Sequence, residues 1–124
     1  MTSMLIDVYK EKTRVIYVDP NNFRSMYELL NCRIVTIETI KIGGRFYDIV
    51  CDDEALFHEP CKISAIDPLA NPVLTGNLLV FRHGKKQMLP LLKEDIRYVQ
   101  RFMQKIYTNF FPKGYVMLTG CEYQ

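Results

Sequence analysis

The sequence predicts a single α+β domain over residues 1–124, with a mixed or antiparallel sheet, a hairpin and two main helices packed on the sheet. Gly43 and Gly44 separate two segments in which side chains alternate between two faces, which is typical of a β-hairpin. Segments 20–31 and 93–111 repeat apolar residues every three or four positions, which predicts helices that cover a sheet. The 124 residues contain no repeat or linker that indicates a second domain.

The first predicted elements are a strand and a helix. Residues 13–18 are rich in β-branched and aromatic side chains, which favours a buried strand. Asp19-Pro20 follows and indicates the start of a helix, because Pro is favoured in the first turn. Apolar residues then share one helical face: Phe23, Met26, Tyr27, Leu29 and Leu30.

The predicted hairpin comes next. Residues 33–41 alternate between two faces, as a strand requires, and residues 45–50 form the returning strand. Gly43 and Gly44 supply the positive φ of a tight reversal. The acidic run 52–54 followed by 55–57 predicts a single helical turn, since acids in a first turn complement the helix dipole. Consecutive carboxylates do not share a helix face, which favours a solvated turn over magnesium or acid–base chemistry.

The second half is predicted to contain a strand, a long helix and a final strand. Residues 63–66 are a short apolar stretch, and residues 73–82 predict one strand in which Gly76 marks a bulge or a close backbone approach. Segment 93–111 predicts a helix of about five turns, ended by Pro112 and Gly114. Residues 115–118 predict a last strand.

One candidate metal site arises from three residues within a short segment. Cys51, His58 and Cys61 offer the thiolate and imidazole ligands that zinc prefers. A tetrahedral site needs a fourth ligand, and the candidates are Cys32, Cys121 and Asp53. The alternative is a buried thiol beside a surface histidine, because free cysteine commonly behaves as a small apolar residue. A Cys51/His58 catalytic dyad is the corresponding enzymatic hypothesis.

Motifs for catalysis are otherwise absent from the sequence. There is no Gly-x-Ser-x-Gly segment, and Gly43-Gly44 lacks the strand–loop–helix context and the Lys-Ser/Thr end of a phosphate-binding loop. The sequence therefore predicts a protein that is not an enzyme.

A cationic edge is the candidate partner-binding surface. A basic turn at 82–86 is followed by three cations spaced by four residues along the predicted second helix. The proposed partner-binding residues are Arg82, Lys85, Lys86, Arg97, Arg101 and Lys105. Tyr98 and Tyr107 would add amphipathic contact area. The alternative is a solvated helix face whose charge is offset by Glu94 and Asp95.

Composition excludes several classes of protein. Sixteen Lys and Arg against fourteen Asp and Glu leave a net charge of +2, so the total indicates neither a polybasic arm nor an acidic mimic of DNA. We find no signal peptide and no apolar run of membrane-spanning length, and expect a cytoplasmic protein that does not enter a membrane. The four cysteines are then expected to be thiols or metal ligands.

Several segments resemble a family of small uncharacterised proteins from phages, plasmids and integrative elements of Gram-positive bacteria, known only as a domain of unknown function. The resembling segments are 15–20, the predicted helix and hairpin that follow, 47–54, 71–80 and the helix that begins at Lys93, so that the similarity runs from about Thr13 to Phe102. Ala55 and Leu91-Leu92 stand where members usually have Gly and Ser or Thr. The family carries no established catalytic residues.

The resemblance implies a function in a mobile element. Small proteins of this kind often block host defence, so the expected function is a non-enzymatic module that binds and inhibits a nuclease such as a Cas effector, as anti-CRISPR proteins do. Inhibition of this kind needs a stable scaffold and a partner surface and no chemistry. A small nucleic-acid-binding regulator and an enzyme with a Cys/His site are the alternatives.

Overall fold

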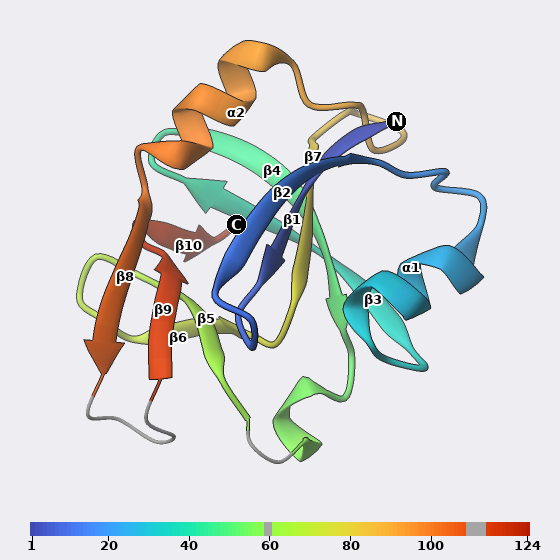
Figure 1. The fold of residues 1–124 in the computed structure, drawn as a ribbon. Helices are drawn as coiled ribbons and strands as arrows, with labels where there is room; N and C mark the ends of the chain where they lie inside the picture. The colour runs from blue at the N-terminus through green and yellow to red at the C-terminus, as the bar shows by residue number, and fades with distance from the viewer. Residues whose placement is uncertain (59–60, 109–113) are drawn as a thin grey trace.

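Two β-sheets and two α-helices make up the described part of the computed structural model, which covers residues 1–58, 61–108 and 114–124. The α+β class expected from the sequence is therefore observed, but with two sheets where the sequence predicted one (Figure 1). In chain order the elements are β1 (Thr2–Asp7), β2 (Lys12–Tyr17), α1 (Phe23–Leu30), β3 (Val35–Ile42), β4 (Arg45–Asp52), the 3-10 turn η1 (Ala55–Phe57), β5 (Ile63–Ile66), β6 (Pro72–Thr75), β7 (Leu78–Arg82), α2 (Lys93–Gln100), β8 (Met103–Thr108), β9 (Gly114–Leu118) and β10 (Cys121–Tyr123).

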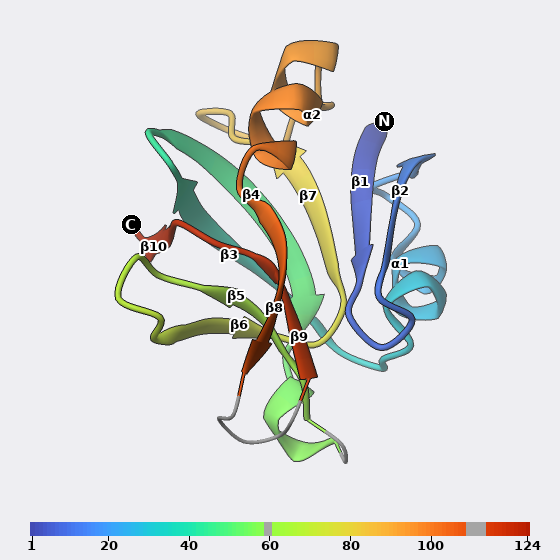
Figure 2. The same ribbon diagram turned by 60° about the vertical axis from the view of Figure 1, so that its left-hand side comes forward.

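The larger sheet has six antiparallel strands in the order β10-β3-β4-β7-β1-β2, and the smaller sheet has the order β6-β5-β9-β8. Within the smaller sheet, β5 and β9 pair in parallel, through Ala65 and Leu118. Figure 2 shows the smaller sheet beside one face of the larger one, while α1 lies on the opposite face. The molecule is thus layered as helix, sheet and second sheet.

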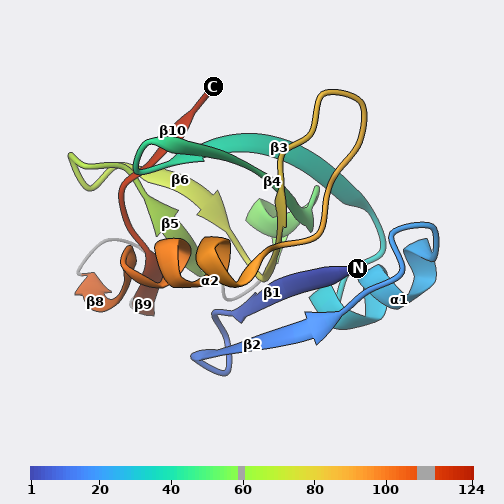
Figure 3. The same cartoon turned by 90° about the horizontal axis from the view of Figure 1, so that it is seen from above.

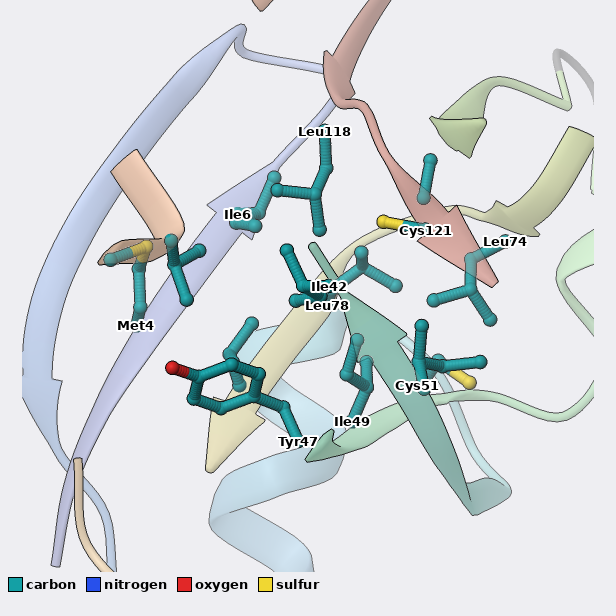
Figure 4. Close-up of a cluster of buried hydrophobic side chains, with 14 of the residues drawn as sticks. Met4, Ile6, Ile42, Tyr47, Ile49, Cys51, Leu74, Leu78, Leu118 and Cys121 are labelled. Atoms are coloured by element: carbon teal, nitrogen blue, oxygen red, sulfur yellow. The ribbon is translucent and has the colours of Figure 1, made fainter. Parts of the chain in front are cut away.

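The main core lies between the two sheets. Alternate residues of β1, β3, β4 and β7 point to this side, as the pleat of a strand requires, and meet apolar residues of β5, β6 and β9. Ile6, Ile42, Leu78 and Leu118 are fully buried here (Figure 4). Val99 of α2 closes the top of the same cluster.

A smaller core lies under α1. Met26 and Leu30 of this helix pack on Leu5, Leu79 and Phe81 of the larger sheet. The helix begins later than residue 20, because the side chain of Asn22 accepts the backbone N–H of Ser25 and caps the first turn. Asn31, in the left-handed conformation, ends it.

The β3–β4 hairpin turns at Gly43–Gly44, with Ile42 and Arg45 as the last paired residues. Gly43 has a φ of +63°. Eight consecutive residues of each strand pair without a bulge. This regular pairing places the inner-face residues of both strands in the main core.

The helix predicted over 93–111 is wrong beyond its second turn. The helix α2 ends at Gln100, and 103–108 form β8, which pairs with β9. The ring of Phe102 lies against Gly43 and Gly120, and its carbonyl accepts the N–H of Thr119, so the chain leaves the helix here. The predicted helix end at 109–112 lies outside the described residues.

The single strand predicted over 73–82 is in fact two strands. Its first part is β6 at the edge of the smaller sheet, and its second part is β7 inside the larger sheet. Gly76 has a φ of +76°, and this left-handed residue turns the chain from one sheet into the other. The apolar pattern did not reveal this change, because both strands are buried.

Candidate functional site

Four of the predicted cationic residues, Lys85, Lys86, Arg97 and Arg101, lie at one end of the larger sheet, which we call the α2 end. It consists of α2, the connection 83–92 and the β3–β4 turn at Gly43–Gly44, all at the top of Figure 1. Figure 3 looks down on this end and shows α2 crossing the molecule while the connection extends outward.

Asp95 fixes α2 to the sheet. Its buried carboxylate accepts the backbone N–H of Leu92 at 2.9 Å and the hydroxyl of Tyr47 at 3.1 Å. The Leu92 N–H belongs to the start of the helix, where donors lack partners inside the helix. One carboxylate therefore caps α2 and ties it to β4.

Tyr98 and Phe102 hold the other end of α2 against the β3–β4 turn. The N–H of Gly44 donates to the Tyr98 hydroxyl at 2.7 Å, and the Arg45 guanidinium lies 4.1 Å from the centre of the Tyr98 ring. A Cβ atom at Gly43 would lie 2.4 Å from the Phe102 ring. The α2 end is thus a fixed surface in which Tyr98 supports the turn.

Five of the six predicted partner-binding residues are exposed, and four of them lie at the α2 end. Lys85 and Lys86 lie in the connection, Arg97 lies on α2, and Arg101 follows directly after it. Within the described residues, none of these four side chains forms an ion pair. Their charges are available to a partner.

Arg82 and Lys105 differ from the prediction. Arg82 is half-buried, donates to the Pro90 carbonyl at 3.2 Å, and has its Nε 4.0 Å from the Asp95 carboxylate, so it supports the connection. Lys105 lies on β8 because the helix has already ended, and so it does not share a helix face with Arg97 and Arg101. Beyond Gln100 a spacing of four residues no longer places side chains on one helix face, because the helix has ended.

His83 and Tyr98 have structural partners that the sequence did not reveal. The His83 Nδ1 lies 2.8 Å from Asp48 Oδ1, which also accepts the Thr39 hydroxyl at 2.9 Å. This contact anchors the start of the connection 83–92. Tyr98 lies under Arg45, and the side chain of Tyr107 lies outside the described part of the chain.

The three predicted zinc ligands do not converge. Cys51 is buried in the main core, Cys61 is buried at the start of the smaller sheet, and His58 is directed to the carboxylate of Asp52 with 2.5 Å between Nε2 and Oδ2. Among the described residues, no three side chains of His, Cys, Asp and Glu lie close enough to hold a metal ion. The zinc site stays a prediction that this geometry does not support.

The candidate fourth ligands are also separate. Cys121 is buried in the main core, and its thiol donates to the Thr119 carbonyl. Cys32 is half-buried beside α1. Asp53 is exposed on the segment that leads to η1.

The proposed Cys51/His58 dyad is not formed, because His58 contacts Asp52. Burial, with the nearby carboxylates of Glu38, Asp52 and Asp53, raises the pKa of the Cys51 thiol to about 12. Such a thiol is almost wholly protonated at neutral pH and is a poor nucleophile. Asp52 itself is buried, which corrects the expectation that the whole run 52–54 is solvated.

A groove of about 320 Å³ lies between the inner face of β3 and strand β6. Its walls include Glu38 of β3, Cys51 of β4 and Val73 of β6, and Tyr123 of β10 and Leu56 of η1 also contribute to the lining. No local pattern in the sequence indicates this groove, because its walls come from distant segments that only the two-sheet arrangement brings together.

Comparison with protein-family models, curated proteins and solved structures finds no match for this chain. The resemblance described above therefore remains an expectation. Among the described residues, no helix is both long and apolar enough to cross a membrane.

Proposed function

We propose that this chain is a non-enzymatic protein-binding module that acts through the α2 end. The observation that carries the proposal is the group of exposed cations, Lys85, Lys86, Arg97 and Arg101, none of which has an ion-pair partner among the described residues. Arg97 lies on α2 and Arg101 directly follows it, and the contacts of Asp95 and Tyr98 hold this helix in place. A rigid surface loses little entropy on binding, which favours a specific partner.

The partner class follows from the charge. The planar guanidinium of arginine binds a carboxylate through two parallel hydrogen bonds, so Arg97 and Arg101 suit an acidic protein surface. A chain with a net charge of +2 carries little long-range attraction for nucleic acid. We therefore favour an acidic protein surface over DNA or RNA.

The biological role we propose is the one that the resemblance implies. The chain would bind a host defence nuclease such as a Cas effector and block it, as an anti-CRISPR protein does. Blocking by occupation needs no reactive group, which agrees with the protonated thiol of Cys51 and the engagement of His58 by Asp52.

The efficiency of plating of a targeted phage on CRISPR-immune bacteria tests this role. Cells that express the chain should support plaques, cells that express Arg97→Glu with Arg101→Glu should not, and the matched double variant Arg14→Glu with Arg24→Glu should behave as the unmodified chain. Arg14 and Arg24 are exposed and lie outside the α2 end, so this control carries the same change of net charge. Immunity that persists with the unmodified chain across the effector classes tested would refute the proposed role.

A further inference from the structure

Strand β3 has an edge that is only partly used. Its partner β4 pairs along the whole strand, from Val35 to Ile42, whereas β10 on the other side pairs only with Ile40, Lys41 and Ile42. Residues 35–39 thus have no strand partner on that side within the described chain. Every second residue of an antiparallel strand directs both its N–H and its C=O to one side, so this edge offers backbone donors and acceptors.

A second strand edge lies opposite. The strand β6 is the last strand of the smaller sheet, and its one strand partner among the described residues is β5. The Tyr123 hydroxyl of β10 donates to the Val73 carbonyl of β6, which connects the two sheets beside the unpaired stretch of β3. The groove of about 320 Å³ is lined by Thr36 and Glu38 of this stretch of β3 and by residues 72–75 of β6. The unpaired stretch of β3 beside the groove is five residues long, which suits an extended peptide.

The charge of the groove is of one sign. Glu38, Asp52 and Asp53 line it, and none of the Lys, Arg and His residues that the structure describes does. Asp52 is engaged by His58, but the carboxylates of Glu38 and Asp53 make no hydrogen bond or ion pair with any described residue. The rest of the lining is largely apolar and includes Leu56, whose side chain is well exposed.

We propose that this groove is a strand-addition site for an extended, basic segment of a partner protein. The segment pairs with residues 35–39 of β3 and directs one Arg or Lys side chain to Glu38, between apolar side chains that contact Val73 and Leu56. Main-chain hydrogen bonds give affinity in this mode, and the side chains that alternate into the groove give specificity. The site is separate from the α2 end and does not rest on the function proposed for that end.

A nuclear magnetic resonance titration tests the site with a defined probe, the peptide acetyl-Thr-Val-Thr-Arg-Thr-Val-Thr-amide, added to millimolar concentration. Its Val, Arg and Val side chains share one face. We expect shifts of the backbone amides of 35–39 and 72–75. The same peptide with Glu in place of Arg, and the same peptide with alternate amides N-methylated so that one edge lacks donors, should leave those amides unshifted.

Charge-reversal variants complete the test. Glu38→Lys should weaken binding of the peptide by at least about tenfold, because a charge-assisted contact becomes a repulsion. Glu122→Lys is the matched control, since Glu122 is exposed on the neighbouring strand and does not line the groove. Glu38→Gln, which avoids a buried cation, should weaken binding in the same direction if Glu38→Lys fails to fold.

Three outcomes would overturn the proposal. They are no shift of 35–39 at millimolar peptide, equal binding of the Glu-containing peptide, and equal effects of Glu38→Lys and Glu122→Lys. Sedimentation of Glu38→Gln provides one more check. If that variant dimerises and the peptide does not dissociate it, the carboxylate only protects the edge from a second copy of the chain.

Discussion

The backbone N–H of Gly44 donates a hydrogen bond of 2.7 Å to the hydroxyl of Tyr98, which joins the β3–β4 turn to helix α2. These two residues are far apart in the sequence, and the bond fixes the outer helix on the sheet. Arg45 lies over the same ring at 4.1 Å from its centre. The contacts of Gly44 and Arg45 with Tyr98 therefore hold helix α2 against the β3–β4 turn.

The close approach at this turn predicts a contrast between its two glycines. Gly43→Ala should lower the free energy of unfolding by about 2 kcal/mol, because the residue has a positive φ and the new methyl group meets the Phe102 ring. Gly44→Ala should cost less than about 1 kcal/mol, since its nearest neighbour, the Tyr98 hydroxyl, would be 3.7 Å away. Urea unfolding measures both, and equal losses would contradict this account of the turn.

Asp95 should be a larger contributor to stability than its neighbour. Asp95→Ala removes the acceptor of the Leu92 N–H and of the buried Tyr47 hydroxyl, so we expect a loss of about 2–3 kcal/mol. Glu94→Ala, at an exposed position on the same turn, should change stability by less than about 0.5 kcal/mol. Thermal and urea unfolding of the two variants would disagree with this ranking if their stabilities fell equally.

Alkaline pH should destabilise the fold. Burial raises the pKa of Cys51 and of Cys121 from 9.0 to about 12, and burial beside Asp95 raises the pKa of Tyr47 to about 12. The folded chain then keeps protons that the unfolded chain releases. The contribution of these groups to the free energy of unfolding is therefore complete below pH 9 and is lost between about pH 9 and 12. Cys121→Ala should flatten the decline measured by urea unfolding at pH 8 to 10.5, whereas an unchanged slope would contradict the shift.

Elemental analysis decides the zinc hypothesis. Because Cys51 is in the core and His58 contacts Asp52, we expect less than about 0.1 zinc per chain in protein purified without a histidine tag. About one zinc per chain, lost with Cys61→Ala, would instead show that the ligands come together in a different arrangement of the segment 51–61.

Local signals predicted some elements well and could not predict others. The apolar stripe that contains Met26 and Leu30 predicted α1, and a strand lies at 114–118 much as expected. The pattern Ile96, Val99 and Met103 continued a helical period past Gln100, although the chain there forms β8. The contacts of Phe102 with Gly43 and Gly120 end the helix, and they are long-range contacts that a local pattern does not contain.

The candidate surfaces also contain features that the sequence predicts and features that it does not. Exposed cations such as Lys85 and Arg97 are visible as residue types, so the sequence predicted four of the residues that are exposed at the α2 end. The support given by Asp95 and Tyr98 depends on contacts with β4 and with the turn, which arise only after folding. Strand β1, which lies between β7 and β2 in the larger sheet, and strand β10 were not predicted either. Without β10 the partly unpaired edge of β3 could not be recognised.

Affinity capture from a nuclease-treated lysate of a Gram-positive host, quantified by mass spectrometry, tests the central claim most directly. The unmodified chain and Arg14→Glu with Arg24→Glu should enrich the same protein, while Arg97→Glu with Arg101→Glu should lose at least about nine tenths of it, because the loss of interface anchors costs more than about 1 kcal/mol each. All three chains should show the same unfolding transition, since exposed charges contribute little to stability. Equal enrichment by both double variants, or enrichment that is seen only when the nuclease treatment is omitted, would contradict the claim that the α2 end binds a protein.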